Sequence, residues 1–257
     1  MSSIPPHIRE FLEEKALHYE TPAFVEGDPI QVPHSFSERE NIEISGLFSA
    51  VLAWGRRDIS IRSSYELIGR MNGRPAEFLL NMEEDDLENF QGFRHRTFNQ
   101  DDCTFFIRAL RRIYRDGQGL YSCFLEGYRR NRSIREAILN FRFEFLKTDH
   151  SPRSTKHLPD PSGNSAAKRI NLFLRWMVRS GERGVDFGLW NEIDPADLLV
   201  PLDLHTANVA RKLGLLQRRQ NDWKAVEELT AVLRELDPSD PVKYDYALFG
   251  MGIYEKF

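Results

Sequence analysis

Apolar side chains recur at helical spacing along most of this chain, which predicts helices wherever they do. The predicted helices cover residues 8–17, 43–57, 60–71, 101–114, 120–128, 133–145, 165–180, 204–215, 224–236 and 241–253. Alternating apolar and polar runs bounded by turn residues are nearly absent, so the pattern does not support strands. The sequence therefore predicts an all-α fold.

Polar residues mark several of the predicted helix starts. Ser37 with Glu40, and Ser133 with Glu136, have the spacing of a capping box. Asp203 stands directly before an apolar helical pattern and is expected to be the N-cap of that helix.

The chain also contains two segments rich in turn residues. Residues 1–36 combine a short helix with a Pro- and Gly-bearing arm, which we expect to run over the surface. Residues 148–164 hold three prolines and form the clearest predicted loop. We expect one helical domain, residues 1–257, made of two lobes joined by this loop.

The composition fits a chain that folds without cross-links. At 257 residues and 41% apolar content it can bury a full core, and its net charge of -4 gives no overall basic field. No secretory leader and no run of about eighteen apolar residues occurs, so a soluble, cytoplasmic protein is expected. The only cysteines, Cys103 and Cys123, are too few for a Cys₄ site or an iron–sulfur cluster. We expect no metal, no other cofactor and a monomer.

Charge is distributed unevenly along the chain. Residues 94–135 hold ten arginines and four acids, a local charge of +6. Such a stretch suits contacts with DNA phosphates, although ordinary solvated helix faces explain it equally well.

Lys168 is the first candidate for chemistry. It lies in the first turn of its predicted helix, where the helix dipole opposes a cation and so favours the neutral amine that a nucleophile requires. The helix has an apolar face made by Ile170, Phe173, Leu174 and Met177, and an opposite stripe made by Lys168, Asn171, Arg175 and Arg179. The alternative is that this stripe is a solvated basic face.

Asp203 is the second candidate. An N-cap carboxylate accepts backbone N–H bonds and feels the helix dipole, so its ionised form is favoured. A carboxylate held in this way can orient a lysine or stabilise a developing cation, but helix capping alone also explains it. His205 has no second histidine at metal-ligand spacing, so it is a structural or binding residue rather than a metal ligand.

The segment around Asp203 resembles part of a known enzyme superfamily. The segment PLDLHTANVARKLGL, residues 201–215, resembles the V-D-T-H-V-x-R-V-x-x-R-L-G segment of helix-hairpin-helix DNA glycosylases, although Asn208 replaces the usual arginine. Residues 47–68, 90–99 and 244–252 resemble other parts of that superfamily. The resemblance implies two packed helical lobes with a cleft between them, and it makes Asp203 the catalytic carboxylate.

Two further likenesses narrow this expectation. The whole chain resembles an uncharacterised conserved bacterial family marked by K-R-x-N-x-F-L-R-W-M-V-R, D-x-G-x-W and P-L-D-x-H. Lys168 and Asp203 are 35 positions apart (203 − 168), which resembles the spacing in the archaeal 8-oxoguanine DNA glycosylase/lyase group. In that group the lysine attacks the sugar of a flipped-out nucleotide and forms a Schiff base.

One expected motif is altered. The hairpin L-P-G-V-G-x-K appears here as LPDPSGNSAAK, residues 158–168, without the paired glycines that let backbone N–H groups approach a phosphate. Phosphate binding at this loop is therefore an open question.

Other residues are candidates for contacts with duplex DNA around a flipped base. They are Arg169, Arg175, His205, Trp190, Asp186, Arg94 and Arg96. Trp190 fits base stacking and core packing equally well, whereas Trp176 is more typical of a core residue. Asp186 fits either a contact with a base edge or a pair with an arginine.

These features lead to one leading function and two alternatives. The first is a DNA glycosylase/lyase that acts on a damaged or modified base, with an oxidised purine as one candidate. The second is a protein that binds nucleic acid or nucleotide without catalysis. The third is an enzyme acting on free nucleosides.

Overall fold

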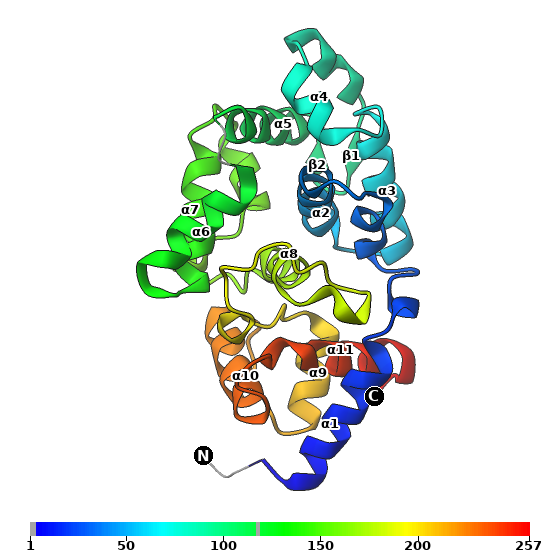
Figure 1. Cartoon of the computed structure of the whole chain (residues 1–257), viewed down its shortest axis with the longest axis vertical. Coiled ribbons are helices and arrows are strands. Elements are labelled where there is room, and N and C mark those ends of the chain that lie inside the picture. The colour runs from blue at the N-terminus through cyan, green and yellow to red at the C-terminus, as the bar shows by residue number, and fades with distance from the viewer. Residues whose placement is uncertain (1–3, 117–118) are drawn as a thin grey trace. The chain divides into compact units, whose positions relative to one another are not determined.

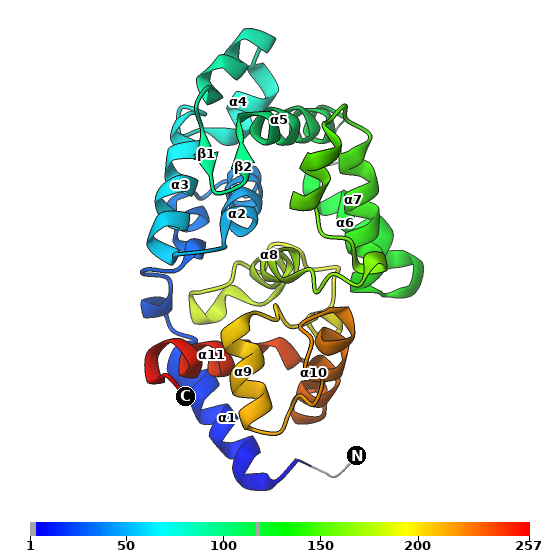
Figure 2. The same cartoon turned by 180° about the vertical axis from the view of Figure 1, so that it is seen from behind.

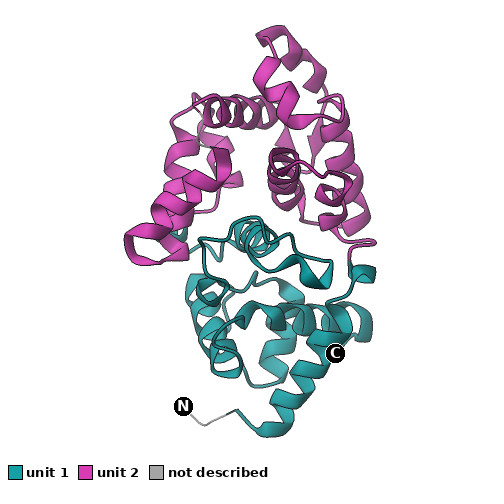
Figure 3. Cartoon of the chain, in the orientation of Figure 1, with its two compact units in different colours: residues 1–24, 161–257 teal, residues 25–160 magenta. Residues whose placement is uncertain are grey.

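The computed structural model describes residues 4–116 and 119–257, and most of them are helical. The chain divides into two compact units, Met1–Phe24 with Pro161–Phe257 and Val25–Asp160 (Figure 3). The expected all-α class is confirmed, since the strands among the described residues are the two short ones of a hairpin. None of the helices in the described ranges is both long and apolar enough to cross a membrane.

Unit 1 contains both ends of the chain. Its helices are α1 (Pro6–Tyr19), α8 (Lys168–Val178), α9 (Leu204–Lys212), α10 (Trp223–Leu236) and α11 (Tyr244–Gly250). Figures 1 and 2 show α1 and α11 side by side although they come from opposite ends of the sequence. The approach is close, because a Cβ atom added at Gly250 would lie 2.3 Å from the ring of Tyr19.

Unit 2 is built from the middle of the chain. Its helices are α2 (Arg39–Leu52), α3 (Arg57–Gly69), α4 (Pro75–Asn81), α5 (Gln100–Arg115), α6 (Gly119–Asn131) and α7 (Ile134–Leu146). The strands β1 (Arg94–His95) and β2 (Phe98–Asn99) pair antiparallel ahead of α5. The sequence pattern missed α4 and this hairpin because both are too short to show a period.

The predicted capping residue is correct at Ser133 and wrong at Ser37. Ser133 accepts a hydrogen bond from the amide of Glu136, as expected. The capping box at Ser37 is wrong, because Glu38 occupies the N-cap of α2 and its side chain makes no capping bond. The same helix ends at Leu52, earlier than predicted, since the chain soon reaches Gly55 with a φ of +94°.

The surface arm predicted before residue 36 is also wrong in its second half. Ile30 and Val32 are fully buried in unit 2. Ile30 lies in the 3₁₀ turn Pro29–Gln31, and Val32 lies between this turn and the next one, Pro33–Ser35. The Ser49 hydroxyl donates to the Pro29 carbonyl at 2.6 Å. Each turn begins with a proline, whose fixed φ suits the first position of a helical turn.

The expected loop 148–164 is partly folded. It contains a 3₁₀ helix, Pro152–His157, in which Ser154 and His157 are buried. Ser154 donates to Asp102 Oδ1 at 2.6 Å, and Arg153 donates to Asp102 Oδ2 at 3.0 Å. The boundary between the units follows Asp160, so the first part of this segment belongs to the packing of unit 2.

Candidate functional site

Lys168 and Asp203 lie together in unit 1. Lys168 Nζ is 3.7 Å from Asp203 Oδ2, and the two side chains are 34% and 11% exposed. Lys168 is the first residue of α8, and Asp203 is the N-cap of α9. A pair that is close but not fully buried can exchange a proton and still be reached by a substrate.

Asp203 is held by the helix that it caps. Its Oδ1 accepts a hydrogen bond from the Thr206 amide at 2.8 Å, which confirms the predicted cap. Its second oxygen, Oδ2, is the atom near Lys168. One oxygen is therefore fixed by the backbone while the other faces the amine.

A second carboxylate lies behind this cap. Asp245, on α11, is buried and accepts a hydrogen bond from the Thr206 hydroxyl at 3.2 Å. Its other oxygen accepts from Arg175 Nη1 at 2.6 Å. Burial raises the pKa of Asp245 to about 6, with Arg175 opposing the rise and the negative charge of Asp203 adding to it. Thr206 thus joins the two acids.

The polar stripe of α8 faces the interior rather than solvent. Asn171, Arg175 and Arg179 are 1%, 2% and 4% exposed, so the solvated basic face considered from the sequence is wrong beyond Lys168. The guanidinium of Arg175 also lies 4.2 Å from the ring centroid of Tyr246. A buried guanidinium needs carboxylate partners, and α11 and the loops of unit 1 supply them.

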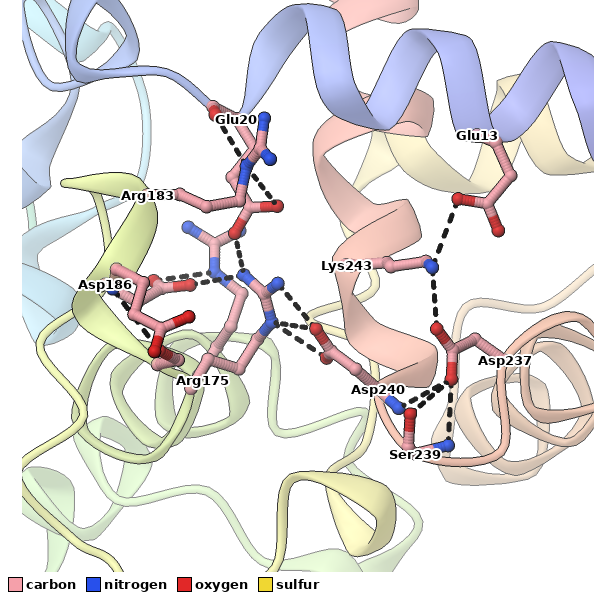
Figure 4. Close-up of polar contacts among 12 residues, drawn as sticks. Glu13, Glu20, Arg175, Arg183, Asp186, Asp237, Ser239, Asp240 and Lys243 are labelled. Carbon is pink, nitrogen blue, oxygen red and sulfur yellow. Dashed lines mark hydrogen bonds and ion pairs between the residues drawn. The ribbon is translucent and has the colours of Figure 1, made fainter.

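Arg179 is the centre of an ion cluster whose partners Glu20, Asp186 and Asp240 are labelled in Figure 4. It contacts Glu20 Oε1 at 2.7 Å, Asp186 Oδ2 at 2.6 Å and Asp240 through two nitrogens at 2.9 and 2.7 Å. Burial opposes its charge, but Asp240 and Asp186 hold the pKa of Arg179 well above its ordinary value. Arg183 reaches Glu20 from the exposed side. This cluster ties α8 to the end of α1 and to the segment before α11.

The structure does not support DNA contacts by three of the predicted residues. Arg175 and Asp186 are buried and lie 3.4 Å apart, so the arginine-pairing alternative for Asp186 is the correct one. Trp190 is fully buried with its ring edge against Phe173, at a centroid distance of 5.3 Å, so it packs in the core, as does Trp176. These predictions failed because each residue type suits both a binding surface and an interior, and only the tertiary contacts decide.

The remaining predicted contacts have different surroundings. Arg169 is half-buried, and burial lowers the pKa of its guanidinium, which stays charged at neutral pH. His205 is exposed in the first turn of α9, with its ring edge toward Phe249. Both lie one or two positions from the Lys168–Asp203 pair in sequence, so they remain candidates for substrate contact.

Arg94 and Arg96 belong to the β1–β2 hairpin of unit 2, and both are exposed. Arg94 Nε donates to the Arg96 carbonyl at 3.1 Å, and the Arg96 guanidinium lies 4.7 Å from the ring centroid of Trp54. These contacts leave both arginines at the surface of their unit, where phosphate binding stays a prediction.

The altered loop before Lys168 has a defined conformation. Asn164 and Ala167 have φ values of +66° and +47°. The Asn164 carbonyl accepts from the Trp223 amide at 3.2 Å, and its side chain donates to Asp222 at 3.0 Å. Left-handed residues therefore turn the chain into α8 without the paired glycines of the glycosylase hairpin.

Sequence reasoning missed the acids behind the site. Asp245 lies in the apolar run YDYALFG, and Asp240 and the hydroxyl residue Thr206 stand in segments whose apolar spacing indicates only a helix. The available signal was the charge of Asp245 at a position where every neighbour is apolar, because such a charge is buried only with a partner.

Comparison with known proteins gives one match. Residues 28–254 match the family model described as "Protein of unknown function (DUF2400)". No curated protein matches the chain, and no solved structure does. Since the match covers most of the sequence, the chain belongs to the DUF2400 family.

Proposed function

We propose that this protein is a DNA glycosylase/lyase that removes a damaged or modified base through an amine nucleophile. The observation that carries the proposal is the 3.7 Å separation of Lys168 Nζ and Asp203 Oδ2 at the starts of two helices. The glycosylase-like pattern around Asp203 supports the choice of DNA as substrate, and the exposed Arg94 and Arg96 are compatible with it.

The proposed reaction begins with proton transfer. Lys168 passes a proton to Asp203, and the neutral amine attacks C1′ of a flipped-out nucleotide. The bond between C1′ and the base breaks, and the base leaves with that electron pair and takes up the proton that Asp203 accepted. The carboxylate that this restores on Asp203 stabilises the positive charge that develops on the sugar.

The covalent intermediate then allows strand cleavage. Opening of the sugar ring breaks the C1′–O4′ bond and leaves a Schiff base between Lys168 and C1′. Loss of a proton from C2′ expels the 3′ phosphate by β-elimination. Water then hydrolyses the Schiff base and frees the lysine.

Borohydride trapping tests this proposal. The full chain is incubated with duplexes that carry an abasic site or one of a panel of damaged bases, and borohydride reduces any Schiff base to a stable cross-link. We expect a cross-link with wild type and background levels with Lys168→Ala. Lys224→Ala is the matched control, since Lys224 is an exposed first-turn lysine of α10. Absence of cross-links on every duplex, or equal yields with Lys168→Ala, would overturn the proposal.

A second candidate is binding of nucleic acid without catalysis. The loop before Lys168 motivates it, because this loop departs from the hairpin of the catalytic superfamily and has Asn164 and Ala167, rather than glycines, at its left-handed positions. Salt-sensitive binding to duplex DNA that survives both Lys168→Ala and Asp203→Asn, with no cross-link and no base release, selects this alternative.

A further inference from the structure

The surroundings of Asp203 include one buried acid that the proposed reaction does not use. Thr206 binds both carboxylates at once, because its amide donates to Asp203 Oδ1 at 2.8 Å and its hydroxyl donates to Asp245 Oδ1 at 3.2 Å. A single residue therefore couples the acid of the site to an acid in the interior.

The charged groups around this pair come from three elements. Lys168 and Arg175 project from α8, Asp203 and Thr206 stand at the start of α9, and Asp245 lies on α11. Lys168 faces Asp203 at 3.7 Å, and Arg175 faces Asp245 at 2.6 Å. Each carboxylate thus faces one cation, although Arg175 also lies 3.4 Å from Asp186, and Thr206 lies between the two carboxylates.

We propose that Asp245 is a positioning residue that controls the proton affinity and the orientation of Asp203 through Thr206. The inference rests on the proposed function of the Lys168–Asp203 pair. A negative charge on Asp245 makes Asp203 hold a proton more tightly, which helps it accept the proton of Lys168. The hydrogen bond from the Thr206 hydroxyl also fixes the first turn of α9, and hence the direction of the Asp203 carboxylate.

The influence of Asp245 on Asp203 should depend on pH. Since burial raises the pKa of Asp245 to about 6, its charge is present at neutral pH and is lost in mildly acidic solution. Asp203 then loses its negative neighbour and becomes a weaker proton acceptor.

The test follows the carboxyl groups directly and needs no substrate. Aspartate carboxyl carbons are labelled with ¹³C in the full chain, and the Asp203 resonance is assigned by its absence in Asp203→Asn. We expect the wild-type Asp203 resonance to show a step near pH 6, where Asp245 titrates. The step should disappear in Asp245→Asn and shrink in Thr206→Val, which keeps the amide bond to Asp203 but lacks the hydroxyl.

Two controls separate coupling from general damage. Thr206→Ser keeps the hydroxyl and should restore the step. Asp240→Asn perturbs the Arg179 cluster and should leave the step unchanged. An Asp203 titration curve that is identical in wild type, Asp245→Asn and Thr206→Val would overturn the inference, and the Thr206 variants decide it even if Asp245→Asn does not fold.

The trapping assay distinguishes this inference from the proposed function. If wild type forms cross-links, the midpoint of the acid limb of the trapping rate should move to lower pH in Asp245→Asn, and an unmoved limb counts against the inference. If wild type forms none, the proposed function fails, whereas the carboxyl titration still supports or overturns the coupling.

Discussion

Lys168 and Asp203 bring the N-termini of two helices to within one ion-pair distance, since Lys168 begins α8, Asp203 caps α9, and their charged atoms are 3.7 Å apart. The positive ends of both helix dipoles are therefore directed at the pair.

Asp203→Asn separates the chemical role of this residue from its capping role. Asparagine caps helices about as well as aspartate, so the melting temperature should change little. Without a carboxylate, proton transfer from Lys168 is lost, and we expect base release to slow by about 100-fold or more. Single-turnover kinetics on a substrate duplex measure this. Unchanged kinetics would assign Asp203 to capping alone.

Removing Arg179 should cost far more stability than removing Arg183. Arg179→Met leaves the buried Glu20 and Asp186 without their central cation, which we expect to cost about 3–5 kcal/mol. Arg183 reaches Glu20 from a side chain that is 41% exposed, so Arg183→Met should cost about 1 kcal/mol or less. Urea unfolding of both variants measures the difference, and equal losses would show that the Arg179 cluster contributes no more than a surface ion pair.

The contacts of Asp102 predict an acid-sensitive unit 2. Burial alone would raise the pKa of Asp102, but His157, the Ser154 hydroxyl and the Asn99 amide outweigh it and hold that pKa well below its ordinary range. A carboxyl with a depressed native pKa contributes stability that is present above about pH 4 and is lost as the pH falls further. The unfolding free energy of wild type should therefore decrease steeply below about pH 4.

Asp102→Asn tests this source of pH dependence. We expect it to flatten the decrease below about pH 4 and to lower stability at neutral pH by about 3–5 kcal/mol. Asp101→Asn is the control, because Asp101 is the exposed neighbour in the same helical turn. Denaturant unfolding measured from about pH 2.5 to about pH 7 covers the range in which carboxyl groups titrate. The same pH slope in Asp102→Asn as in wild type would refute the assignment.

Two helical glycines should respond to alanine in opposite directions. A Cβ atom at Gly127 would lie 2.3 Å from the Glu136 carbonyl, because α6 and α7 pack closely at that point. Gly127→Ala should therefore destabilise the protein by about 1–3 kcal/mol. Gly69 has no atom within 4 Å of such a Cβ, so Gly69→Ala should be neutral or stabilise by up to about 1 kcal/mol. Thermal unfolding compares them, and a neutral Gly127→Ala would contradict the close packing of α6 and α7.

The sequence predicted the features that depend on residues close together in the chain. The helical class follows from apolar periodicity, and the cap at Asp203 follows from a polar residue directly before an apolar helical run. The closeness of Lys168 and Asp203 was expected only from the resemblance, because no local rule relates residues so far apart in sequence.

Tertiary contacts decided the features that the sequence did not reveal. In the sequence, the stripe of α8 that contains Arg175 is typical of a solvated face. In the structure, Asp245 and Asp186 pair with Arg175 in the interior. The segment around Ile30 has the composition of a surface arm, yet Ile30 and Val32 are buried within unit 2. In both cases the partners come from distant parts of the chain, which periodicity cannot predict.

If Lys168 is the nucleophile, the covalent adduct must form on its side-chain amine, and locating that adduct decides the proposal. Borohydride-trapped complex on an abasic duplex is digested with nuclease and protease, and mass spectrometry locates the modified amine. We expect a reduced sugar adduct on Lys168 Nζ and none on Lys224. An adduct confined to another amine, or no adduct at all, would contradict it.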